Sequence, residues 1–206
     1  MVAKRRRRSP EEAQRQILDV AEAMLAESGP DAIRLQDIAE RVGISHPTIL
    51  HHFGSREALL AAVVRRAIEA LESDLLAALR SPDITEAQIE DLVERVFETF
   101  HDRGHARVMA WLLLSGQVKP TETGSQIRAV AELAHQQRLI HHAGKGSRPR
   151  FEDTLFSIML VAVVLFGDAV AGEAMSSSAG LARDQKSRKR FRTWLARLVV
   201  THLEEH

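Results

Sequence analysis

The 206-residue chain contains no cysteine, which excludes both a disulfide framework and a thiolate metal site. This absence agrees with a reducing, cytoplasmic location. Tyrosine is also absent, and aromatic residues make up only 4% of the chain. The formal net charge is zero, so no overall basic excess indicates a nucleic-acid partner. Evidence for such a partner must come from the local distribution of charge.

Long uninterrupted apolar runs are lacking as well. The strongest candidate, Leu155 to Val170, is interrupted at Ser157 and at Gly167-Asp168. It is also shorter than the ~20 apolar residues that a membrane span needs. We therefore predict a buried helix and no membrane association. The basic N-terminal residues lead into Ser9-Pro10-Glu11-Glu12 rather than an apolar stretch, so no signal peptide is expected.

Motifs of catalysis are missing too. The sequence has neither Gly-x-Ser-x-Gly nor His-Glu-x-x-His, and Gly144-Lys145 lacks the earlier glycine of a phosphate-binding loop. His101 and His105 have the spacing of helical metal ligands, but Gly104 is expected to end the helix between them. His141-His142 lies at a predicted helix end, where such side chains complement the helix dipole. We expect solvated histidines at both places, and no enzyme activity, metal or cofactor.

Helical patterns, in contrast, occur throughout the chain, which is rich in Leu, Ala, Arg and Glu. The apolar spacing and the capping residues predict an all-α fold, in a chain long enough for one large domain or two small ones. The predicted helices cover, approximately, residues 10–28, 35–42, 46–53, 55–79, 85–103, 108–116, 127–140, 151–175 and 184–202.

The most informative stretch is Arg34 to Leu60. Its first part places apolar side chains at i, i+3, i+4 and i+7, which is one face of a helix. These residues are Leu35, Ile38, Ala39 and Val42. Gly43 supplies a left-handed position that ends this helix, and Ser45 can cap the next one, with Pro47 in its first turn. Because Ile49 and Phe53 turn the second helix back onto the first, the pair reads as a helix-turn-helix.

The other face of the second helix is polar. It carries His46, Thr48, His51 and His52, which are compact donors and acceptors suited to base edges and phosphates. A helical hairpin with a solvated outer face is the plainer interpretation. At this point the sequence resembles the DNA-binding domain of TetR-type transcriptional regulators, from about Glu11 to Leu60. The resemblance rests on Ile38-Ala39, Val42-Gly43-Ile44-Ser45, Thr48-Ile49, His52-Phe53-Gly54-Ser55 and Glu57-Ala58-Leu59.

The resemblance implies two domains: residues 1–55, which bind DNA, and residues 56–206, which bind a ligand and dimerise. Residues 1–9 form a basic arm, in which Lys4 to Arg8 would follow phosphates. The residues expected nearest the bases are Ser45, His46, Pro47 and Thr48, and those expected nearest phosphates are Arg34, His51, His52 and Arg56. Leu50 stands where the family usually has a tyrosine, so a thymine methyl contact would replace a hydroxyl. Arg34 stands where a Ser or Thr cap is usual.

The resemblance also implies two surfaces in the C-terminal part. An apolar pocket for a small inducer would draw on Phe97, Phe100, Met109, Trp111, Phe156 and Met159, although most of these residues could simply form core. The predicted helix from Phe151 is apolar nearly all round and therefore needs cover on two sides. A dimer interface would use Leu155, Ile158, Ala162 and Leu165 of this helix, with Phe191, Trp194 and Leu198 of the last helix.

The expected function is that of a repressor that binds a palindromic operator as a homodimer and is released by a small apolar molecule. Two alternatives remain at this point. One is an apolar-ligand-binding helical protein that does not bind an operator, and the other is a helical enzyme whose site the sequence does not reveal.

Overall fold

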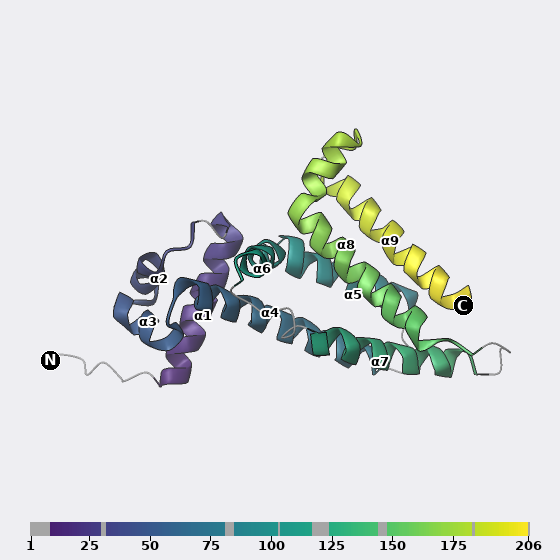
Figure 1. The fold of residues 1–206 in the computed structure, drawn as a ribbon, viewed down its shortest axis with the longest axis horizontal. Coiled ribbons are helices and arrows are strands. Elements are labelled where there is room, and N and C mark those ends of the chain that lie inside the picture. The colour runs from purple at the N-terminus through teal and green to yellow at the C-terminus, as the bar shows by residue number, and fades with distance from the viewer. Residues whose placement is uncertain are drawn as a thin grey trace. The chain divides into compact units, whose positions relative to one another are not determined.

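The computed structural model describes residues 9–29, 32–80, 85–102, 104–116, 124–143, 148–182 and 184–205. The predicted all-α fold is confirmed, since the described residues form helices and no strand (Figure 1). The helices are α1 (Pro10–Ser28), α2 (Leu35–Val42), α3 (His46–Phe53), α4 (Arg56–Leu79), α5 (Glu86–Phe97), the π-helical η2 (Glu98–Asp102), α6 (His105–Leu114), α7 (Gly124–His141), α8 (Phe151–Ser178) and α9 (Gln185–Glu205). The basic arm lies outside the described residues.

Contacts divide the chain into an N-terminal unit, Met1–Arg66, and a C-terminal unit, Ala67–His206. This division falls inside α4, later than the boundary predicted after residue 55. The ion pairs of Arg66 explain the difference, because its guanidinium lies 2.6 Å from Asp19 and 2.5 Å from Glu22, both on α1. The first part of α4 therefore belongs with α1, and its remainder belongs to the C-terminal unit.

The N-terminal unit is built on α1. Ser9 caps this helix by accepting the Glu12 backbone N–H at 3.2 Å, and Gly29 ends it with a φ of 74°. The buried face of α1 packs against α2 and α3. Its core consists of Ile17, Ala21, Met24 and Leu25 of α1, with Ile38, Ala39 and Ile49 of the two following helices.

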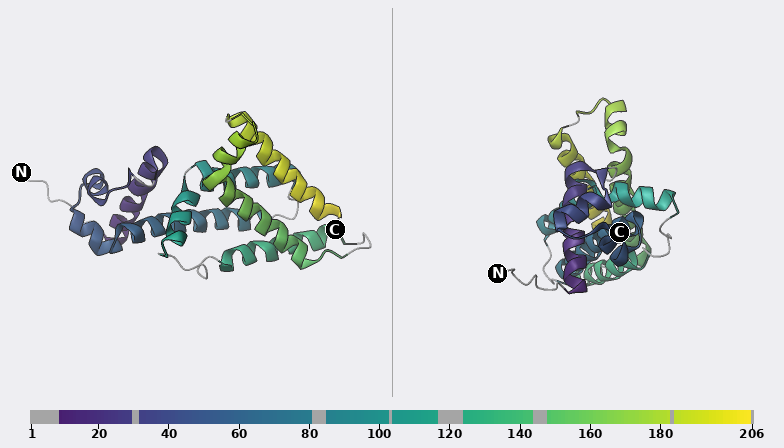
Figure 2. Two further views of the ribbon diagram at one scale, coloured as in Figure 1. Left: turned by 45° about the horizontal axis from the view of Figure 1, so that its top comes forward. Right: turned by 90° about the vertical axis from the view of Figure 1, so that its left-hand side faces the viewer.

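In the C-terminal unit α7 packs along α8, and α8 also contacts η2, α6 and α9 (Figures 1 and 2). One core cluster joins Phe97, Leu165 and Leu195, from α5, α8 and α9. The single helix predicted over residues 85–103 is thus α5 followed by a π-helical turn, where the hydrogen-bond spacing widens.

Two histidines expected to be solvated are buried instead, so that part of the prediction is wrong. His105 is fully buried, and its Nδ1 lies 2.7 Å from the Thr99 carbonyl. His142 is 8% exposed, and its Nδ1 lies 3.0 Å from the Arg138 carbonyl. Hydrogen bonds to backbone carbonyls offset the cost of burying each ring. His141 is exposed, as expected. The side chain of His101 is not among those that the structure describes.

The prediction that residues 155–170 form a buried helix is also wrong for the single chain. Only 22% of the most apolar 18-residue window of α8 is buried inside the chain. By length and composition alone, α8 could cross a membrane. Five large apolar side chains in this stretch are exposed: Phe156, Met159, Leu160, Val163 and Val170. Exposed apolar patches of this kind mark sites of interaction with proteins or membranes.

Candidate functional site

The turn between α2 and α3 has the geometry that the sequence predicts. Gly43 adopts a left-handed conformation, with φ 73° and ψ 39°, and its N–H donates to the carbonyls of Ala39 and Glu40. The Ile44 N–H also donates to the Ala39 carbonyl, at 3.0 Å. These bonds satisfy the last carbonyls of α2 and set the angle at which the chain enters α3.

The N-terminus of α3 is held by its own first residues. Ser45 is the N-cap, and its Oγ accepts the Thr48 N–H at 3.4 Å and lies 2.8 Å from Thr48 Oγ1. Ile49 is fully buried and fixes the inner side of the helix. Ser45 and Pro47 are consequently exposed, whereas His46 and Thr48 are half-buried. The four residues predicted nearest the bases thus occupy one accessible helix end.

The last turn of α3 continues this accessible surface. Leu50 is 38% exposed, His51 is exposed and His52 is half-buried. The His52 ring centroid lies 5.8 Å from that of His51 and 6.5 Å from that of Phe53. Phe53 is only half-buried, so Ile49 is the main apolar anchor of the helix.

The two arginines predicted to meet phosphates differ in their surroundings. Arg34 is exposed at the N-cap of α2, and its side chain makes no capping bond. Arg56 is half-buried, with its Nε donating to the Ile33 carbonyl at 2.8 Å and its Nη1 3.9 Å from Glu57. Arg56 therefore holds the segment before α2 against the start of α4, and Arg34 is the more accessible of the two cations.

The residues predicted to line an apolar pocket differ in their exposure. Phe97 is fully buried in the core cluster, with the Arg192 guanidinium 4.7 Å above its ring. Phe156 and Met159 are 59% and 44% exposed on α8. Trp111 is exposed, and Phe100 and Met109 are half-buried.

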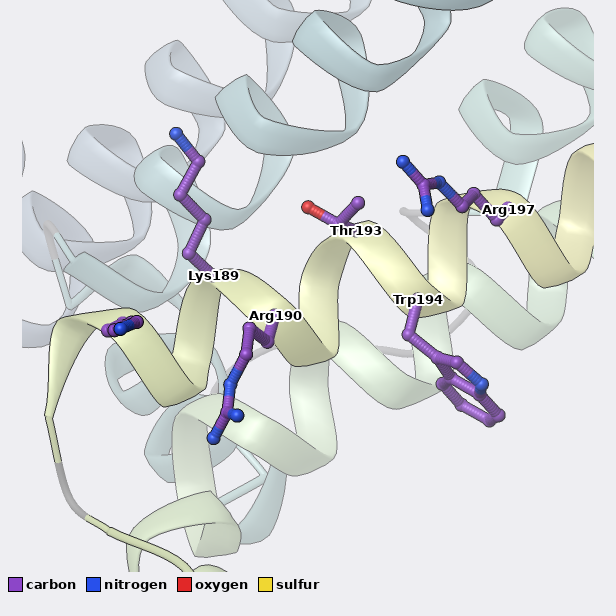
Figure 3. A pocket seen from close by; sticks show the side chains of 6 residues that line it. Lys189, Arg190, Thr193, Trp194 and Arg197 are labelled. Carbon is purple, nitrogen blue, oxygen red and sulfur yellow. The ribbon is translucent and has the colours of Figure 1, made fainter.

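An open surface hollow of about 430 Å³ runs along α9. It is lined by Lys186, Lys189, Arg190, Thr193, Trp194 and Arg197. Figure 3 shows Lys189, Thr193 and Arg197 projecting to one side of α9, and Arg190 and Trp194 projecting to the other. Such a groove between two side-chain ridges of one helix differs from the enclosed apolar pocket that the sequence predicts.

The residues predicted to form a dimer interface divide into two groups. On α9, Phe191, Trp194 and Leu198 are 40%, 58% and 46% exposed, and the Phe191 and Trp194 rings stack with centroids 6.1 Å apart. On α8, Leu165 is buried in the core of its own chain, and Leu155, Ile158 and Ala162 are half-buried.

The predicted interface did not include Leu160, Val163 and Val170, which are among the most exposed apolar residues of α8. Their exposure follows from the side of α8 that packs inward. Thr154 and Ser157 are buried, so the small polar side of α8 faces the chain's interior and the large apolar side faces outward. Among the described residues, no group of three His, Asp or Glu side chains could hold a metal ion.

Comparison with known proteins agrees with this architecture. The family model described as "Bacterial regulatory proteins, tetR family" matches residues 17–63, which contain α2, the turn and α3. The HTH-type transcriptional repressor Rv3405c of Mycobacterium tuberculosis is 29% identical over 207 residues, covering 98% of this chain and 96% of the repressor. The HTH-type transcriptional activator FasR of Mycolicibacterium smegmatis is 28% identical over 131 residues, covering 63% of this chain and 58% of the activator.

The fold is shared with solved structures of the same kind. A transcriptional regulator from Saccharomonospora viridis, crystallised in complex with choline, superposes with a TM-score of 0.63 at 19% identity. The match covers 94% of this chain and 96% of that one. Residues 17–63 thus belong to the DNA-binding domain of the TetR family of bacterial regulatory proteins, and the chain as a whole is similar in sequence to a helix-turn-helix transcriptional repressor and in fold to a solved transcriptional regulator.

Proposed function

We propose that this regulator is a cytoplasmic repressor that binds a palindromic operator as a homodimer and is released by a small apolar molecule. The observation that carries the proposal is the exposed N-terminus of α3, capped by Ser45 and anchored by Ile49. A rigid helix end of this kind can enter a major groove and present side chains to base edges.

Within this proposal the residues of α3 have distinct tasks. Ser45, His46, Pro47 and Thr48 approach the bases, and Leu50 contacts a thymine methyl. His51, His52 and the exposed Arg34 contact phosphates, which sets the register of the helix in the groove. Arg56 contributes mainly by fixing the Ile33 carbonyl, which keeps the start of α2 in place.

The dimer follows from the apolar surface of α8 and α9. We call this surface the pairing face: Phe156, Met159, Leu160, Val163 and Val170 of α8, with Phe191, Trp194 and Leu198 of α9. A second copy would cover this face, as in the apolar interior of a homodimer interface. It would also supply the second helix-turn-helix that a palindromic operator needs. Leu155, Ile158 and Ala162, half-buried beside this face, would lie at its edge.

The proposed ligand response draws on proteins of the same family and fold. The regulator from Saccharomonospora viridis was crystallised with choline, so this fold accommodates a small molecule in at least one relative. Repression is proposed because one relative that matches nearly the whole chain is a repressor. The apolar ligand would bind among the helices after residue 82, where most of the large apolar side chains lie.

A mobility-shift titration with the DNA upstream of the protein's own coding sequence, at fixed salt, tests this function. We expect one shifted species with the mass of a dimer on the duplex, and loss of binding in a His46→Ala/Thr48→Ala variant. The matched control is Gln14→Ala/Arg15→Ala, on the exposed side of α1. Tight binding of an apolar molecule without any operator binding would instead indicate the alternative, a ligand-binding protein that does not act on DNA.

A further inference from the structure

A buried polar cluster joins three helices of the C-terminal unit. Arg138 of α7 donates from Nη1 to the Thr154 hydroxyl of α8 at 2.6 Å. Its Nη2 and Nε donate to the Leu203 carbonyl of α9, at 2.8 and 3.2 Å. His135 Nδ1 lies 3.2 Å from the same Thr154 hydroxyl, and His142 Nδ1 lies 3.0 Å from the Arg138 carbonyl. The Arg138 guanidinium of α7 thus binds one acceptor on α8 and one on α9, and His135 shares the acceptor on α8.

The cation at the centre of this cluster is costly to bury. Arg138 is 8% exposed, and Thr154 is completely buried. Burial lowers the pKa of Arg138, and the nearby Asp153 carboxylate only partly offsets this. The hydrogen-bond acceptors of the guanidinium are a hydroxyl and a backbone carbonyl rather than a carboxylate. An apolar side chain of similar size often fills such a site at equal or lower cost, so Arg138 contributes geometry more than stability.

The geometry concerns the end of α9. Leu203 lies in the last turn of that helix, whose carbonyls have no partners within the helix. A forked guanidinium satisfies one of these carbonyls twice and complements the negative end of the helix dipole. Figure 1 shows the C-terminal end of α9 near the end of α7 and the start of α8, in agreement with these bonds.

Other contacts hold α9 at its start and along its middle, where Leu195 lies in the core cluster and Val199 packs against it. The helix begins at Gln185, soon after α8 ends at Ser178, so the chain itself holds its first turn near α8. Nearer its middle, Arg192 pairs with Glu94 of α5 at 2.9 Å. Arg138 provides the corresponding hold at the far end, five residues beyond Leu198 and therefore about 7.5 Å along the axis.

We infer that Arg138 is a positioning residue for dimerisation, which locks the last turn of α9 to α7 and α8 and so fixes the α9 part of the pairing face relative to the α8 part. Leu198 and Trp194 then keep one arrangement relative to the exposed side chains of α8, which a symmetric interface between two copies requires. This inference rests on the proposed dimer, and the experiment below distinguishes failure of the inference from failure of the dimer proposal.

The experiment compares full-length wild type with Arg138→Met, Arg138→Lys and Thr154→Val. Sedimentation equilibrium gives the dimer Kd, hydrogen exchange reports the amides of residues 199–205, and denaturant titration reports the unfolding midpoint. We expect Arg138→Met to weaken the dimer at least tenfold and to speed exchange in the last turn of α9, with the midpoint unchanged or raised. Arg138→Lys keeps part of the donor set, and Thr154→Val keeps the Leu203 carbonyl as an acceptor. For both variants, the dimer Kd and the exchange rates should lie between those of wild type and those of Arg138→Met.

Val108→Ala is the control, because Val108 is fully buried in α6 and its truncation destabilises the unit without touching the cluster. It should lower the unfolding midpoint and leave the dimer Kd unchanged. An unchanged Kd for Arg138→Met, or weakening only in proportion to lost stability, would overturn the inference. If wild type stays monomeric at 100 µM, the proposed dimer itself is wrong. The exchange data then decide alone whether Arg138 fixes the end of α9.

Discussion

The hydroxyl oxygens of Ser45 and Thr48 lie 2.8 Å apart at the N-terminus of α3. The Ser45 hydroxyl also accepts the Thr48 N–H, so the cap and one side chain proposed to approach the bases form a single unit. The orientation of Thr48 therefore depends on the residue that starts the helix. This coupling allows helix stability and DNA recognition to be separated by experiment.

Ser45→Ala should lower the free energy of unfolding by about 1 kcal/mol, as loss of an N-cap does. It should also weaken operator binding by more than that loss of stability explains, because Thr48 is no longer oriented. Ser9→Ala removes the equivalent cap of α1 and is the matched control. Denaturant titration and mobility shift measure the two effects. Equal operator affinity for the two variants would contradict the proposed role of the Ser45–Thr48 pair.

The basic arm should give affinity without specificity. Deleting Lys4 to Arg8 is predicted to reduce the salt slope of operator binding by roughly 4–5 units if every charge meets a phosphate. Arg34→Gln should reduce it by about 1 unit. In both variants the ranking of operator sequences should stay that of wild type, since phosphates carry no base information. A changed ranking would show that the deleted residues read a groove.

The pairing face predicts the effect of an added charge. Val163 is 67% exposed in the single chain, so Val163→Arg should fold normally but place an uncompensated charge in the dimer interface. Trp194→Arg should act in the same way from α9. Both should yield monomers by sedimentation and should lose operator binding. Leu114→Arg, at a position 89% exposed on α6, is the control that should remain dimeric. Nanomolar operator binding by a demonstrated monomer would refute the requirement for a dimer.

The ligand response should show thermodynamic reciprocity. Because α4 contributes residues to both units, it is the segment through which a ligand in the C-terminal unit would act on the helix-turn-helix. A ligand that weakens operator affinity must itself bind more weakly to the operator complex by the same factor, typically 5–150-fold. Calorimetric titration of the ligand with and without saturating operator measures this factor. Identical ligand affinities in the two titrations would mean that ligand binding does not control DNA binding.

His135 predicts a pH dependence of stability. Burial, followed by the positive charges of Arg138 and Arg148, lowers the pKa of His135. The folded state therefore binds this proton less readily than the unfolded state, whose histidine pKa is about 6.5. The free energy of unfolding should fall as the pH drops from 7.5 to 5.5. His135→Gln should reduce this fall. Parallel pH profiles for wild type and His135→Gln would refute the assignment.

Local chemistry in the sequence determined most of the helices and the whole helix-turn-helix. Ser9, Ser45 and Gly43 act on backbone groups within four residues of themselves, so their effects do not depend on the rest of the fold. The apolar residues of α2 likewise lie on a single face of the helix, and Ile38, Ala39 and Val42 are buried as this spacing predicts. Interactions of this range are fully present in a linear sequence.

The tertiary structure alone decided which side of α8 faces inward. A helix that is apolar nearly all round has no preferred direction, so its spacing could not distinguish buried Leu165 from exposed Val163. The buried histidines and Arg138 were undetectable for a related reason. Each has a backbone carbonyl among its partners, a group that every residue possesses, and the Leu203 carbonyl lies 65 residues from Arg138 in the chain. Such contacts exist only after packing brings the helices together, because a carbonyl leaves no mark on the residue type that carries it.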